Sequence, residues 1–158
     1  MRTQRKTTVI LLIEDNPDDV LLIRREVARC GGTIEVHVVK DGLEGIRYLD
    51  GTNEFRNRRR FPLPDVILLD LNLPRLSGFG FLEWLREDKQ GSLRFIPVVV
   101  LSGCDDSGQE SRAYALGANL YLVKPGHWSQ FAEVLQSIAQ LWRRQPGMPA
   151  ITDSAKLP

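Results

Sequence analysis

The segment Asp65–Pro74, with the sequence DVILLDLNLP, constrains the fold more than any other part of the chain. Its apolar run ends on Asp70, and a run this apolar indicates a strand buried on both faces, as in a parallel sheet. Such a strand needs no aspartate at its end for stability. Because ligand sites gather at the carboxyl ends of parallel strands, Asp70 is a candidate functional residue.

Three further apolar runs end in polar side chains in the same way. The run Val9–Ile13 is followed by Glu14 and Asp15, the run Ile96–Leu101 by Ser102, and the run Leu120–Val123 by Lys124. Four parallel strands would therefore bring carboxylates, a hydroxyl and an amine to one edge of a sheet. A solvated rim explains any one of these residues alone, but all of them together favour a site.

Strand-like runs alternate along the chain with segments of helical periodicity. Strands are predicted at Thr8–Ile13, Ile34–Val39, Val66–Leu69, Ile96–Leu101 and Leu120–Val123. Helices are predicted from Pro17 up to Gly31, over Leu43–Leu49, and at Phe79–Lys89, Ser107–Leu116 and Trp128–Trp142. With right-handed crossovers, this alternation predicts an α/β fold with a doubly wound, five-stranded parallel sheet covered on both faces.

The chain has 158 residues, which favours one domain, and we expect that domain to span residues 1–143. Residues 144–158 are rich in proline, which predicts a flexible C-terminal tail. The net charge of +1 gives no field that would drive the chain onto nucleic acid or a membrane. The apolar runs are far shorter than the ~20 residues of a membrane span. A cytoplasmic protein without membrane or direct nucleic-acid binding is therefore expected.

The candidate residues suit phosphoryl chemistry. Glu14, Asp15 and Asp70 would repel one another unless they were protonated or bound a cation. Mg²⁺ commonly joins one or two carboxylates to a phosphate. Lys124 could pair with a phosphate oxygen or with Asp70, and the Ser102 hydroxyl could donate to a phosphoryl oxygen. This set of groups fits phosphoryl transfer onto a carboxylate.

The order and strand context of these residues resemble those of a known family. Glu14-Asp15, Asp70, Ser102 and Lys124-Pro125 look like the motifs of the receiver domain of two-component response regulators. The resemblance covers roughly residues 8 to 143 and implies the flavodoxin-like (βα)5 receiver fold. It also implies that Asp70 is the phosphoacceptor and that a sensor histidine kinase is the phosphodonor.

The resemblance assigns a role to each of the other site residues. Asp15, Asp70 and the backbone carbonyl of Asn72 would hold Mg²⁺, and Glu14 would contribute through a water molecule. Lys124 would bind the phosphoryl group.

Ser102 stands at the position of the family's switch hydroxyl, and Tyr121 stands at that of its aromatic switch residue. Tyr121 could instead simply pack in the core. The family also implies a cis peptide bond between Lys124 and Pro125.

A narrower resemblance is carried by three features: the long loop Gly51–Pro64 with its four arginines, the turn after Asp70, and the aromatic end of the last predicted helix. Together these features look like the small response regulators that pair with phytochromes, so a bacteriophytochrome is the narrower expectation for the kinase. The arginines could also bind an acidic partner, but a solvated loop is the commoner explanation for such a cluster. Because few residues follow Trp142, a stand-alone receiver without an effector domain is expected.

The last predicted helix carries more apolar residues than one sheet face needs. Phe131, Leu135, Ile138 and Trp142 follow a three-four spacing, and they predict a homodimer interface that would signal through this helix and its neighbours. A broad core helix is the alternative.

Two other functions stay open at this stage. A receiver that is never phosphorylated would act as a scaffold for partner proteins. A magnesium-dependent phosphohydrolase would need a second acid after its nucleophile, and position 72 is Asn. A non-enzymatic signalling protein is therefore favoured.

Overall fold

A central sheet of five parallel strands carries the site at its carboxyl edge. The computed structural model describes residues 7–30, 34–89 and 91–124, together with residues 131, 133, 135 and 137. The strands are β1 (Thr8–Ile13), β2 (Ile34–Val39), β3 (Val66–Asp70), β4 (Val98–Ser102) and β5 (Leu120–Val123). Their order in the sheet is β2-β1-β3-β4-β5, with every neighbouring pair parallel. The predicted doubly wound fold is thus confirmed.

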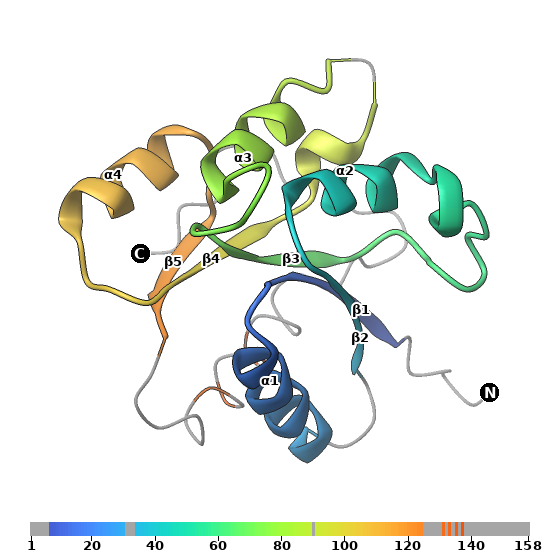
Figure 1. The fold of residues 1–158 in the computed structure, drawn as a ribbon, viewed down its shortest axis with the longest axis horizontal. Helices are drawn as coiled ribbons and strands as arrows, with labels where there is room; N and C mark the ends of the chain where they lie inside the picture. The colour runs from blue at the N-terminus through green and yellow to red at the C-terminus, as the bar shows by residue number, and fades with distance from the viewer. Residues whose placement is uncertain are drawn as a thin grey trace.

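Helices lie on both faces of the sheet. They are α1 (Pro17–Arg29), α2 (Gly42–Asp50), α3 (Gly78–Arg86) and α4 (Ser107–Ala115), with short 3-10 turns η1 (Asn53–Phe55) and η2 (Leu93–Phe95). Helix α1 covers one face, whereas α2, α3 and α4 cover the other (Figure 1).

The alternation of side chains along each strand builds one core layer on each face. In β1, Leu11 and Ile13 pack with residues of α2 and α3, whereas Ile10 and Leu12 pack with Ile23 of α1 and its neighbours. Both layers are apolar, which explains why the inner strands β1, β3 and β4 have nearly continuous hydrophobic sequences.

The predicted element boundaries differ from the observed ones where backbone pairing or a cap decides them. Strand β4 begins at Val98 rather than Ile96, after a proline that has no N–H to donate to a neighbouring strand. Helix α3 begins at Gly78, because the Ser77 side chain accepts from the Gly80 N–H, and it ends at Arg86 rather than Lys89.

The last predicted helix contributes two described side chains to the core. Phe131 and Leu135 are buried in the layer that contains Ile10 and Leu12. This position corrects their predicted role in a dimer interface: both side chains cover the sheet, so they are not available to a second subunit. Ile138 and Trp142 lie outside the described residues.

The arginine-bearing loop is anchored to the domain rather than only solvated. Arg58 donates to two carbonyl oxygens in the last turn of α2, that of Tyr48 at 2.7 Å and that of Leu49. The Tyr48 and Phe61 rings both pack against Phe55 with centroids 5.2 Å away. Because the last carbonyl groups of a helix have no partner within the helix itself, the Arg58 guanidinium supplies a charged donor to the C-terminus of α2.

Replacing Arg58 with alanine should lower the free energy of unfolding by about 2 kcal/mol, because charge-assisted hydrogen bonds to partly buried carbonyls are lost. Chemical denaturation measures the change. Arg59→Ala, which removes an exposed arginine one residue away, is the matched control and should be nearly neutral. Equal losses in the two variants would contradict the capping role of Arg58.

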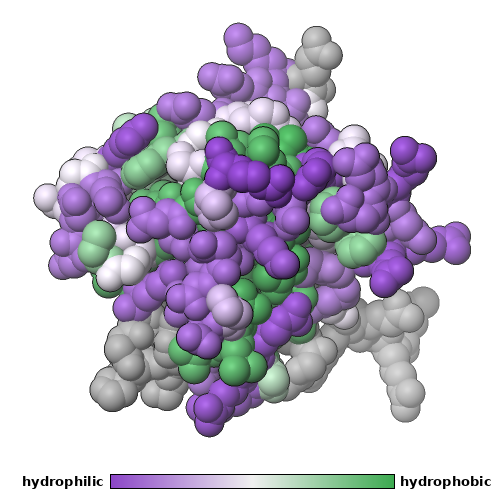
Figure 2. All heavy atoms as spheres, in the orientation of Figure 1, coloured by the Kyte–Doolittle hydropathy of each residue, from purple (hydrophilic) through white to green (hydrophobic). Residues whose placement is uncertain are grey.

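The surface of the described part is mostly hydrophilic on the face shown in Figure 2, with hydrophobic residues in small areas between polar ones. Within the described ranges, none of the helices has the length and hydrophobicity that a transmembrane segment requires.

Candidate phosphoacceptor site

Three carboxylates meet where β1 and β3 end. The two strands pair directly, with Ile13 opposite Leu69, so the residues that follow them lie side by side. Glu14, Asp15 and Asp70 each place one carboxylate oxygen in this cluster, and the three oxygens lie within 4.8 Å of one another. Glu14 and Asp70 are buried, and Asp15 is exposed. The structure therefore brings together the three acids that the sequence placed at this edge.

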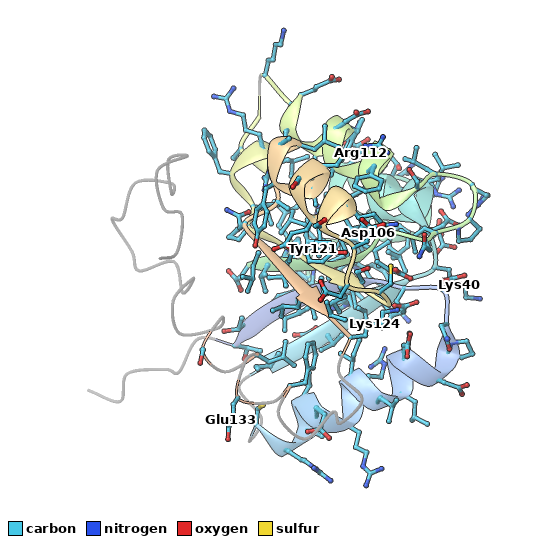
Figure 3. All side chains as sticks on the ribbon, turned by 90° about the vertical axis from the view of Figure 1, so that its left-hand side faces the viewer. Lys40, Asp106, Arg112, Tyr121, Lys124 and Glu133 are labelled. Carbon is cyan, nitrogen blue, oxygen red and sulfur yellow. The ribbon has the colours of Figure 1, made fainter. Side chains whose placement is uncertain are left out.

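Lys124 lies at the end of β5, between the sheet and α1 (Figure 3). Its Nζ donates to Glu14 Oε2 at 2.7 Å and to Asp19 Oδ2 at 2.8 Å, and it lies 3.6 Å from Asp70 Oδ2. The sequence predicted pairing with Asp70 or a phosphate, but it did not predict Asp19. An acid in the first turn of a helix complements the helix dipole, and that explanation was sufficient for Asp19 in the sequence. Its pairing with Lys124 was therefore missed.

The electrostatics of Glu14 and Lys124 follow from burial and pairing. Burial raises the pKa of Glu14 above its ordinary value, although the hydrogen bond from Lys124 acts in the opposite direction. Burial alone would lower the pKa of Lys124, but hydrogen bonds to Asp19 and Glu14 outweigh it and raise that pKa. One ammonium group thus serves several carboxylates, and negative charge remains for a cation to neutralise.

The set of donors fits Mg²⁺. Carboxylate oxygens are the ligands that this hard cation prefers, and Mg²⁺ usually takes only one or two of them directly. Asn72 is exposed, and its N–H donates to Asp70 Oδ1 at 3.2 Å. That hydrogen bond holds the residue close to the carboxylate, although the ligand role of its carbonyl stays a prediction.

Ser102 and Tyr121 share one acceptor. Ser102 Oγ donates to the carbonyl oxygen of Cys104 at 3.0 Å, and the Tyr121 hydroxyl donates to the same oxygen at 3.2 Å. Both side chains are buried. The two predicted switch residues are therefore coupled through the backbone that follows β4. The sequence does not show which backbone carbonyl group a hydroxyl will use as its acceptor, so this link could not be predicted.

The turn after Asp70 is fixed from two sides. Gly78 donates its N–H to the Leu71 carbonyl at 3.1 Å. Arg75, with a φ of 62°, forms an ion pair with Asp41, the N-cap residue of α2. The peptide bond between Lys124 and Pro125 includes a residue outside the described ranges, so the predicted cis bond stays a prediction.

The strand order, with acids at the ends of β1 and β3, defines a doubly wound α/β domain whose site lies at the carboxyl edge of the sheet. The family model described as the response regulator receiver domain matches residues 10–149. The chain therefore belongs to the receiver domains of response regulators, which act in two-component signalling.

Similar proteins narrow the relationship. The response regulator Rcp1 of Synechocystis sp. is 34% identical over 143 residues, which cover 90% of this chain and 93% of that protein. The Mn²⁺-bound form of Rcp1 gives a TM-score of 0.72 at 31% identity, over 90% of this chain and 99% of that one.

Two other solved structures are also similar. The response regulator RPA3017 in red light signaling of R. palustris gives a TM-score of 0.80 at 32% identity, over 91% of this chain and 99% of that one. The phosphorylated cyanobacterial phytochrome response regulator RcpA gives a TM-score of 0.76 at 35% identity, over 90% of this chain and 99% of that one. The chain is thus related to phytochrome response regulators.

Proposed function

We propose that this protein accepts a phosphoryl group on Asp70 from a sensor histidine kinase. The observation that carries the proposal is the position of Lys124 beside the clustered carboxylates, 3.6 Å from Asp70. An Asp70 carboxylate oxygen would attack the phosphorus. The P–N bond of the donor's phosphohistidine breaks, and its electron pair stays on the imidazole nitrogen.

Each surrounding residue has a distinct task. Asp15, Asp70 and the Asn72 carbonyl would hold Mg²⁺, with Glu14 acting through a water molecule. The cation supplies charge neutralisation for the transferring phosphoryl oxygens. Lys124 would bind one of these oxygens. The Ser102 hydroxyl would leave the Cys104 carbonyl for another, which frees that carbonyl to interact with Tyr121 alone.

We further propose that the kinase is a bacteriophytochrome. This proposal is supported by the relationship to a cyanobacterial phytochrome response regulator and to a red-light response regulator. A cytoplasmic location is consistent with this role. Homodimerisation through Ile138 and Trp142 stays a prediction of the sequence pattern, and sedimentation of Trp142→Glu against the wild type would test it.

The phosphorylation proposal predicts an acid-labile label after incubation with Mg²⁺ and a small phosphodonor such as phosphoramidate. Asp15→Asn should need a higher Mg²⁺ concentration for half-maximal labelling, because it removes one carboxylate ligand. Asp18→Asn removes the same charge from a neighbouring exposed position and is the matched control. Wild-type protein that takes no label with Mg²⁺ bound would instead support a scaffold that is never phosphorylated.

A further inference from the structure

Asp19 is the acid beside Lys124 to which the receiver motifs assign no role. The distance from Lys124 Nζ to Asp19 Oδ2 is 2.8 Å, nearly as short as the 2.7 Å to Glu14 and well below the 3.6 Å to Asp70. In this arrangement the phosphoacceptor has the weakest contact with the lysine, and Asp19 has one of the strongest.

The backbone of Asp19 is well anchored. Asp19 lies in the first turn of α1, where Asn16 Oδ1 accepts from the N–H groups of Asp18, at 2.9 Å, and Asp19, at 3.5 Å. The same helix is fixed to the sheet by the buried side chains of Ile23 and Val27. The carboxylate therefore projects toward Lys124 from a defined position rather than from a mobile loop.

The contact between Asp19 and Lys124 is largely shielded from water. The side chains of Lys124 and Asp19 are only 15% and 20% exposed. By contrast, Asp18 is exposed and forms no ion pair with any other residue that the structure describes. Because the helix dipole favours an acid at either position, it cannot explain why Asp19 alone reaches the lysine.

We infer that Asp19 is a positioning residue that holds Lys124 in the unphosphorylated protein and competes with the incoming phosphoryl group for it. This inference rests on the proposed phosphorylation of Asp70. A phosphoryl group brings a charge of about −1.5 to −2, against −1 for the free carboxylate. It therefore draws the ammonium group toward Asp70, and the contact with Asp19 weakens as the lysine moves.

The competition predicts that removing the Asp19 charge speeds phosphorylation. Asp19→Asn keeps the size of the side chain but ends the ion pair with Asp19, so Lys124 has one charged partner fewer to leave when it moves to the phosphoryl group. An ion pair at a partly exposed site is worth up to about 1 kcal/mol, so the initial rate of labelling with phosphoramidate and Mg²⁺ should rise about fivefold. Asp18→Asn, with the same charge change one residue away, should label at the wild-type rate.

A variant that lacks Lys124 separates a positioning role of Asp19 from a merely structural effect. In Lys124→Met protein, the further change Asp19→Asn should leave the residual rate unchanged, because Asp19 acts through the lysine. A rate increase that persists in this background would overturn the inference, as would equal rates for Asp18→Asn and Asp19→Asn or a slower rate for Asp19→Asn. Wild-type protein that takes no label would overturn the proposed function itself, whereas the other outcomes leave that function intact.

Discussion

Alanine in place of Gly78 is expected to destabilise the protein by about 3 kcal/mol, at the upper end of the cost of overpacking. A Cβ atom at this position would lie 2.3 Å from the carbonyl oxygen of Asp70 and 2.7 Å from the Cα of Leu71. Both atoms belong to the backbone, so no side chain can rotate away to relieve the contact. The clash would also displace the backbone that positions the phosphoacceptor.

Chemical denaturation of Gly78→Ala and the wild type measures the loss. Gly103→Ala is the matched control, because it makes the same substitution near the site, where a Cβ would meet nothing within 4 Å. We expect that control to unfold at nearly the wild-type denaturant concentration. If Gly78→Ala were as stable as Gly103→Ala, the described close approach of α3 to the end of β3 would be incorrect.

Replacing Lys124 with methionine should slow the phosphorylation of Asp70 by about 10²- to 10³-fold, the usual cost of removing one group that stabilises transition-state charge. Methionine keeps an apolar stem of similar length but removes the ammonium group that contacts Glu14 and Asp19. The same change should tighten Mg²⁺ binding, because a positive charge beside the carboxylates is lost.

The opposite directions of these two effects separate a specific role of Lys124 from misfolding, which would weaken both properties. Calorimetric titration measures the Mg²⁺ affinity, and the initial rate of labelling measures the chemistry. Lys40→Ala removes an exposed lysine and should change neither. Weaker Mg²⁺ binding in Lys124→Met would show that the lysine supports the metal site rather than competing with the cation.

The sequence predicts the parts of this molecule that depend on local pattern. The strands β1, β2 and β5 have the bounds that the sequence predicts, and each is followed directly by a charged residue. Glu14, Asp15 and Asp70 meet because parallel strands align their carboxyl ends. These features need only periodicity and topology.

The contacts that could not be predicted join residues that are distant in the chain or use backbone acceptors. Lys124 and Asp19 are separated by 105 positions, and their pairing depends on how far a lysine stem reaches across the end of the sheet. Arg58 was interpreted as part of a basic loop, yet it caps α2 through carbonyl groups. Phe131 was predicted to lie in a dimer interface, yet it is buried in the core. An apolar stripe on a helix does not show how much of it the sheet already covers.

The identity of the phosphorylated residue tests the central claim most directly. Borohydride reduces an aspartyl phosphate to homoserine, which marks the modified position permanently. After incubation with Mg²⁺ and phosphoramidate, followed by borohydride and peptide mass spectrometry, we expect homoserine at position 70 in the wild type and none in Asp70→Asn. Phosphorylation at another residue, or undiminished labelling of Asp70→Asn, would contradict the assignment of Asp70 as the phosphoacceptor.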